Sequence, residues 1–339
     1  MTSDQPAIPP KVVWDLATPC KAIRDDLGKD ALSRLHRKSL ISDWALFAAT
    51  WALFIGLWWW LARIPLGAAW CAGAFLQAVI IFNAFYAMRH DLFFHRQIAG
   101  QKGSYAMGVL CSFVLFQPYT EHTLHEDHHV HVGWDLSEEL ITDLDRRWKR
   151  WLCLTMVGIL LLLARRLRPP GAPRPNQGVR PPPDWAMQLK REKRLQLAFY
   201  VLLAAATWAW PWGVFKGYLL PVLVFGPFVL MTRFIFQHAE TDPGNAFHAA
   251  LYLRTGLFSR LLFYNAIGDG HLAHHFFPSI PLYRAGAAAD LFHPILLKHG
   301  VRQRSLPGVL RAYFFEGREY RTRWEPEGDK MSSPGARGA

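Results

Sequence analysis

The sequence predicts an all-α integral membrane protein with four transmembrane helices in two hairpins, a cytosolic cap rich in histidine, and one or two helices in the membrane interface. Three observations predict this fold. About half of the 339 residues (51%) are hydrophobic, and they gather into long runs that a soluble fold rarely needs. Basic residues flank these runs. Three groups of histidines stand beside the ends of the runs, so that separate segments can contribute to one site.

Four segments are long and apolar enough to cross a bilayer, which requires about 20 residues of helix. They are residues 44–62, 64–88, 195–215 and 217–237. Pro65 favours a tight turn within the first pair, and Pro211 with the following Trp212 and Gly213 favours one within the second. Arg233 lies close to one end of the last segment, so its side chain is expected to extend to the interface. These segments predict two helical hairpins.

Two further apolar segments, residues 103–120 and 151–164, are ambiguous. The first is uncharged and nearly long enough to span, whereas the second is short and has arginines at both ends. The three histidine groups can share one site only if an even number of crossings separates them. A single crossing by either segment would place one group on the opposite face of the membrane. We therefore expect both segments to lie in the interface or to be covered by protein.

Basic residues determine the expected orientation, because the cytosolic loops of membrane proteins carry an excess of lysine and arginine. Such residues are abundant before the first span and between the hairpins, whereas the outer turns carry only Arg63 and Lys216. Both termini and every histidine group are therefore expected in the cytosol. The expected organisation is a cytosolic segment at 1–43, a membrane domain at 44–325 whose cap comprises 89–194 and 238–325, and a disordered tail at 326–339.

The composition argues against two other classes of protein. The formal net charge of +12 invites comparison with nucleic-acid-binding proteins, but the basic residues flank apolar runs and do not interleave with exposed aromatic residues. No nucleic acid is therefore expected as a partner. The four cysteines are scattered without paired spacing, which favours small buried side chains over disulfides or a zinc site.

The histidine groups have spacings suited to binding metal. They are HDLFFH at 90–95, HTLHEDHH at 122–129 and HLAHH at 271–275. Imidazole is a nitrogen donor suited to iron, zinc, copper and nickel. Histidines three and four residues apart share one face of a helix. This spacing applies to His125, His128 and His129 and, again, to His271, His274 and His275.

The first group has a different spacing. His90 and His95 are five residues apart, about 140° around an ideal helix, so they can share a face only if the helix is locally distorted; otherwise they reach different metals. His238 follows the last span at the same membrane depth and is a candidate ninth ligand. Nine imidazoles exceed what one ion coordinates, so two metals are expected. The residues expected to fix the ligand rings and their tautomers by hydrogen bonds are Asp91, Asp127, Asp269 and His122.

Together these motifs resemble the membrane fatty acid desaturase family, whose signature is three histidine boxes. His90 and His95 match the first box, the trio at 125–129 matches the second, and the trio at 271–275 matches the third. The stretch FFPSIPLY at 276–283 is also similar to the sequence that follows the third box in the family. The resemblance covers about residues 44–294. It implies a di-iron centre that activates O2, abstracts hydrogen from an unactivated C–H bond and removes a second hydrogen to leave a double bond.

The resemblance has further implications for ligands and partners. It implies that His238 joins the metal ligands and that Asn265 holds one metal through water. Because no fused cytochrome b5 signature is found, electrons are expected from a separate ferredoxin, rubredoxin or cytochrome. A basic cytosolic surface suits an acidic electron carrier. The implied substrate is a long acyl chain linked to a lipid, to coenzyme A or to a carrier protein.

Two other functions stay open at this stage. A lipid or carotenoid hydroxylase or ketolase has similar boxes, and only the mass of the product distinguishes it from a desaturase. A membrane metal transporter would need polar ligands near the middle of the bilayer. The predicted spans offer little there, chiefly Gln77, Asn83 and Gln196. The transporter is therefore the weaker alternative.

Overall fold

The computed structural model describes residues 15–120, 147–158, 160, 184–238, 245–254, 256–262 and 270–316. The regular secondary structure in these ranges is helical. The β-type pairing in these ranges is an isolated bridge between Leu253 and Arg304. The predicted all-α class is therefore confirmed for this part of the chain. Several segments are π-helices, in which each backbone N–H donates to the carbonyl five residues back.

The helices of the first half lead from a peripheral helix into the apolar bundle. They are α1 (Ala17–Leu35), α2 (Leu40–Arg63), α3 (Ala68–Val79), the π-helix η1 (Ile80–Phe85), α4 (Tyr86–Met88), the π-helix η2 (Arg89–His95) and α5 (Gly100–Val114). As predicted, the chain turns at Pro65, because the residue before a proline avoids helical backbone angles. Segments α3 to η2 form one continuous helix, which continues past the predicted end of the span at residue 88 to His95.

The helices of the second half include the third histidine box. They are α8 (Arg147–Cys153), α10 (Trp185–Ala209), α11 (Pro211–Val214), the π-helix η4 (Phe215–Leu219), α12 (Leu220–His238), the 3-10 turn η5 (Ala246–His248), α13 (Leu257–Leu262), α14 (His271–Phe276), α15 (Leu282–Lys298), α16 (Leu306–Leu310) and the π-helix η7 (Arg311–Phe315). The helix breaks at Trp210, so the predicted span 195–215 covers the end of one helix and the start of the next. The break directly precedes Pro211, where a turn was predicted, although the predicted span extends past it to residue 215.

Among the described residues, three helices are long and apolar enough to cross a membrane: Leu40–Arg63, Ala68–His95 and Pro211–Arg233. Helix α10 is long enough, but charged residues fill positions 190–194 and leave an uncharged stretch only at 195–209. Helix α5 has 15 residues and is about 22 Å long, less than the roughly 30 Å of a bilayer core. Its length agrees with the expectation that segment 103–120 does not cross.

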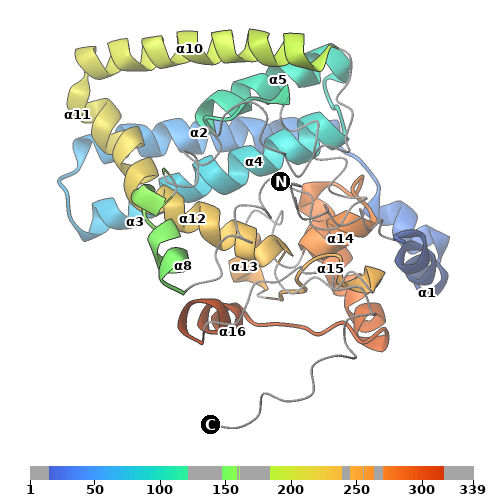
Figure 1. Ribbon diagram of the computed structural model, residues 1–339. Helices are drawn as coiled ribbons and strands as arrows, with labels where there is room; N and C mark the ends of the chain where they lie inside the picture. Colours follow the sequence, from blue (N-terminus) through green and yellow to red (C-terminus); the bar gives the residue numbers. More distant parts are fainter. Residues whose placement is uncertain are drawn as a thin grey trace, which may run out of the picture.

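The long helices lie side by side, with α10 along one edge of the bundle next to α5 (Figure 1). Between α2, η1 and η4 the core is aromatic: the Phe54 and Phe85 rings meet edge to face at 5.3 Å, and Trp58 stacks on Tyr218 at 5.2 Å. Gly217 allows the close approach of α2, because a Cβ atom there would lie 2.2 Å from Cδ1 of Trp58.

Helix α10 is attached to the end of α5 by a buried carboxylate. Glu192 is 1% exposed and accepts hydrogen bonds from the backbone N–H of Thr120 at 2.7 Å and from its hydroxyl at 2.5 Å. Farther along, Phe113 stacks on Phe199. The outward face of α10 is apolar and exposed, with Leu197, Val201 and Leu202 among its exposed side chains. This surface suits contact with lipid.

Arg233 contradicts its sequence-based prediction. The side chain does not extend to the interface but is 4% exposed within the bundle, where Nη1 donates to the carbonyl of Phe82 at 2.5 Å. The guanidinium also lies over the ring of Tyr86. The prediction was wrong because the acceptor is a backbone carbonyl about 150 residues earlier in the chain, which the local sequence does not reveal.

Candidate metal centre

His90 and His95 lie on the π-helix η2, at the end of the second long helix. Five residues of an α-helix would turn their side chains about 140° apart. A π-helix instead bonds each N–H to the carbonyl five residues back, so residues with this spacing lie over one another. In η2 the centroids of the two imidazole rings are 4.6 Å apart. The local distortion that the sequence required is therefore a π-helical segment.

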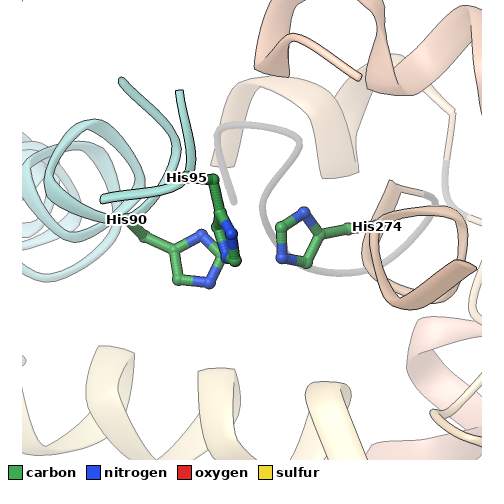
Figure 2. Close-up of side chains that lie close together, drawn as sticks. All are labelled: His90, His95 and His274. Atoms are coloured by element: carbon green, nitrogen blue, oxygen red, sulfur yellow. The ribbon is translucent and has the colours of Figure 1, made fainter. Parts of the chain in front are cut away.

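His274 on α14 joins these two residues. The centroid of its ring lies 4.5 Å from that of His90 and 5.0 Å from that of His95. One ligand nitrogen from each of the three lies within 4.8 Å of the others. Figure 2 shows the three rings close together, carried by two separate segments of the chain. The first and third histidine boxes thus meet at the same end of the helix bundle.

The other two histidines of the third box form a pair. His271 and His275 are one turn apart on α14, and their Nε2 atoms are 3.2 Å apart. They are 3% and 2% exposed. Their ring centroids lie 6.3 and 6.4 Å from that of His274, so one helical turn contributes to two neighbouring groups of nitrogen atoms. We call these groups the trio (His90, His95 and His274) and the pair (His271 and His275).

The donor atoms of both groups fit a transition metal such as iron. Imidazole suits this class of ion, and two nitrogens that bind one ion at about 2.1 Å are separated by about 3.0–3.4 Å. The separation of 3.2 Å within the pair falls in that interval. The trio is wider, at up to 4.8 Å, and its rings would have to move inward to share one ion. The described residues thus present two adjacent groups with the chemistry of a metal site.

Behind the trio lies a buried ionic network. Asp91 follows His90 in the sequence, and its Oδ2 atom accepts the backbone N–H of Leu282 at 3.1 Å and pairs with Nε of Arg96 at 3.3 Å. Arg96 also pairs with Asp43 in the first turn of α2. Among the described residues, Asp91 therefore contacts a guanidinium and a backbone amide, and the predicted contact with a histidine ring is absent.

The network connects three elements that the sequence does not bring together. Asp43 belongs to α2, Asp91 lies within the first box and Arg96 directly follows it, and Leu282 begins α15 just after the third box. Sequence reasoning missed Asp43 and Arg96. The available signals were an acidic residue at the start of an apolar segment and an arginine directly after His95. The network fixes the first box relative to the start of α15, directly after the third box.

Two further residues at the site were also missed. Tyr86 and Gln237 line a cavity of about 30 Å³ together with His90, His271 and His274. A cavity of this size holds one or two water-sized species, not an acyl chain. The Tyr86 ring stacks on the His90 ring with the two centroids 5.7 Å apart. Gln237 brings the end of α12 to the cavity, one residue before His238.

Several predicted site residues cannot be placed. His238 is the last residue of α12, but its side chain is outside the described part of the structure. The remaining predicted ligands and hydrogen-bonding residues lie wholly outside the described residues; they are His122, His125, Asp127, His128, His129, Asn265 and Asp269. Their roles stay predictions.

A comparison with protein families assigns most of the chain. The family model described as fatty acid desaturase matches residues 68–307, a range that begins with α3 and extends into α16. It therefore includes the trio, the pair and the ionic network except for Asp43. A search of curated proteins finds no match to the chain.

Proposed function

The chain belongs to the fatty acid desaturase family, and from this premise we propose that it is an O2-dependent di-iron desaturase of long-chain acyl groups. A desaturase-like oxidoreductase activity follows from the family. The di-iron mechanism is the more specific part of this proposal, and it rests on the contact between the first and third boxes. There, one ligand nitrogen each from His90, His95 and His274 lies within 4.8 Å of the others. Three imidazoles from two distant segments, one buried and two half-buried, are the donor set expected of a metal centre.

In this proposal nine histidines hold two iron ions. They are His90, His95, His125, His128, His129, His238, His271, His274 and His275. When bound, the iron pair would supply the oxidising chemistry that removes hydrogen from an unactivated C–H bond. Asp127, Asp269 and His122 would hold ligand rings, and Asn265 would bind one metal through water.

The described residues bury and position several of these histidines. Burial of His90, His271 and His275 keeps water away from the donor nitrogens, since none is more than 7% exposed. The contacts of Asp91 with Arg96 and Leu282 hold the first box in register with the third. The π-helix η2 presents His90 and His95 to a common point. The chain thereby preorganises the ligands before any metal binds.

The membrane topology is part of the proposal. We infer four spans, the fourth being the uncharged residues 195–209 of α10. Both termini and the metal centre would face the cytosol, with a cytosolic segment at 1–43, a membrane domain at 44–325 and a tail at 326–339. The acyl chain, linked to lipid, coenzyme A or carrier protein, would enter from the apolar bundle. A separate ferredoxin, rubredoxin or cytochrome would deliver electrons.

The contacts of the polar residues in the spans argue against a transporter. The amide nitrogen of Gln77 donates to the carbonyl of Phe54 at 3.2 Å, and that of Asn83 donates to the carbonyl of Leu262 at 2.9 Å. Both side chains thus connect neighbouring segments of the fold. These contacts give the two residues a packing role and favour an enzyme.

Lipid profiling of a host that expresses the chain tests this proposal. The wild-type protein should produce an unsaturated acyl chain two mass units lighter than its precursor, and a His274→Ala variant expressed at the same level should not. A product heavier by one oxygen would instead identify a hydroxylase and contradict desaturation. A purified protein without iron, or turnover that persists without O2, would contradict the di-iron mechanism.

A further inference from the structure

A buried arginine on α12 contacts the helix that carries the first histidine box. Arg233 donates from Nη1 to the carbonyl of Phe82, which lies in the π-helix η1. In an α-helix that carbonyl would accept from the N–H of Tyr86, four residues later. Here the N–H of Tyr86 donates to the carbonyl of Asn83. The guanidinium thus bonds to the backbone where the helix changes its hydrogen-bonding pattern.

The same arginine contacts the aromatic ring that stacks on His90. Its guanidinium carbon lies 3.9 Å from the centroid of the Tyr86 ring. The Tyr86 ring lies 5.7 Å from the His90 ring, with 20° between their planes. Tyr86 and His90 are four residues apart and share one face of the helix. A planar, permanently charged guanidinium binds well to an aromatic face.

We propose that Arg233 is a positioning residue for the metal centre and acts through Tyr86 to fix the ring of His90. The inference rests on the proposed function, because it requires His90 to be a metal ligand. The terminal side-chain torsion of histidine is broad, so the ring plane needs an external restraint. Tyr86 supplies that restraint by stacking on His90, and the guanidinium of Arg233 holds the Tyr86 ring in place.

The restraint is also consistent with the burial of Arg233. An arginine in an apolar helix is costly, and such residues persist mainly where they serve a site. Gln237, one turn after Arg233 on α12, lines the cavity beside Tyr86 and His90. One face of α12 therefore reaches the metal centre through two side chains, one directly and one through a stack.

Binding of Co²⁺ to the full-length apoprotein in lipid nanodiscs tests the inference without any turnover. The visible absorption of Co²⁺ reports the geometry of its ligands, and titration gives its affinity. Arg233→Gln and Tyr86→Leu should each change the absorption spectrum and weaken Co²⁺ binding about tenfold. A loss of this size is typical when a residue that supports a metal ligand is replaced. Tyr86→Phe retains the ring face and should keep the wild-type spectrum. Arg233→Lys retains the charge but loses the planar group and should still change it.

Arg150 offers a matched control. It is also a buried arginine, 2% exposed, and it donates to the carbonyl of Tyr313 at 2.7 Å with its guanidinium near the ring of the same residue. It does not line the cavity. Arg150→Gln should therefore lower thermal stability to a similar degree as Arg233→Gln and leave Co²⁺ affinity and absorption unchanged.

The outcomes distinguish a failure of the positioning role of Arg233 from a failure of the proposed metal centre. Wild-type Co²⁺ affinity and absorption in folded Arg233→Gln or Arg233→Lys would overturn the positioning role and leave the metal centre intact. An equal loss of affinity in Arg150→Gln would also overturn it, because the effect would then be one of general stability. If the wild-type protein bound no Co²⁺ through histidine, the proposed metal centre would fail and the inference with it.

Discussion

The ionic network behind the trio gives a quantitative prediction for Asp43→Asn. The side chains of Asp43 and Arg96 are fully buried, and that of Asp91 is 4% exposed. Removing one partner of a buried ion pair typically costs about 3–5 kcal/mol, because a charge is left without compensation. Here Asp91 remains 3.3 Å from Arg96, an attraction of about 5 kcal/mol at an effective dielectric constant of about 20. The loss should therefore lie near the lower end, about 3 kcal/mol.

Asp290 provides the matched control for this measurement. Its carboxylate also pairs with two arginines, Arg254 at 2.5 Å and Arg260 at 2.8 Å, but its side chain is 48% exposed. Exposed pairs contribute about 0–1 kcal/mol. Asp290→Asn should therefore reduce the free energy of unfolding by no more than about 1 kcal/mol. Asp290→Asn removes two ion pairs and Asp43→Asn removes one, so a larger loss for Asp43→Asn would reflect burial and not the number of pairs.

Equilibrium unfolding in mixed micelles, followed by tryptophan fluorescence, measures both effects. A cycle with Asp43→Asn, Arg96→Met and the double variant isolates the coupling, and the double variant should be less destabilised than the sum of the single variants. A loss for Asp43→Asn no larger than that for Asp290→Asn would refute the reasoning. So would strict additivity, because it would mean that the two side chains do not interact.

Four further changes have expected outcomes. His274→Ala should lower the iron content of the purified protein, as measured by mass spectrometry, without preventing membrane insertion, and full iron content would remove it from the ligand set. Gly217→Ala should destabilise the protein by about 1–3 kcal/mol in a thermal assay, since its Cβ atom would meet Trp58 at 2.2 Å. Gly56→Ala, where nothing lies within 4 Å, should stabilise by about 0.5–1 kcal/mol; equal effects at the two positions would contradict the packing of α2 on η4. Glu192→Gln should cost about 1.5–3 kcal/mol by weakening two buried hydrogen bonds to Thr120, and no change in unfolding would show that the attachment of α10 is dispensable.

The sequence is most informative where local composition decides the structure. The turn at Pro65 follows from the effect of proline on the preceding residue, and uninterrupted apolar runs identify α2 and the helix that ends at His95. Composition failed at α10, where hydropathy continues past the true break. The break at Trp210 itself agrees with the turn predicted at Pro211, because the residue before a proline avoids helical backbone angles.

Contacts between distant segments determine the partners of two polar side chains. Arg233 was expected to extend to the interface because it lies close to one end of its span, but it donates to the carbonyl of Phe82. Asp91 was expected to hold a ligand ring, and among the described residues its carboxylate contacts Arg96 and the amide of Leu282. In both cases the local sequence identifies a polar group that must be satisfied. The fold determines which partner satisfies it.

The two histidine boxes in the described structure show how spacing and helix type are matched. The third box uses spacings of three and four residues and lies on an α-helix, where His271 and His275 face each other one turn apart. The first box uses a spacing of five and lies on a π-helix, which brings His90 and His95 together. A spacing that is wrong for an α-helix is therefore evidence about the backbone itself. If both histidines must reach one point, the helix has to widen, and the requirement of the site selects the rarer helix over the intrinsically more stable one.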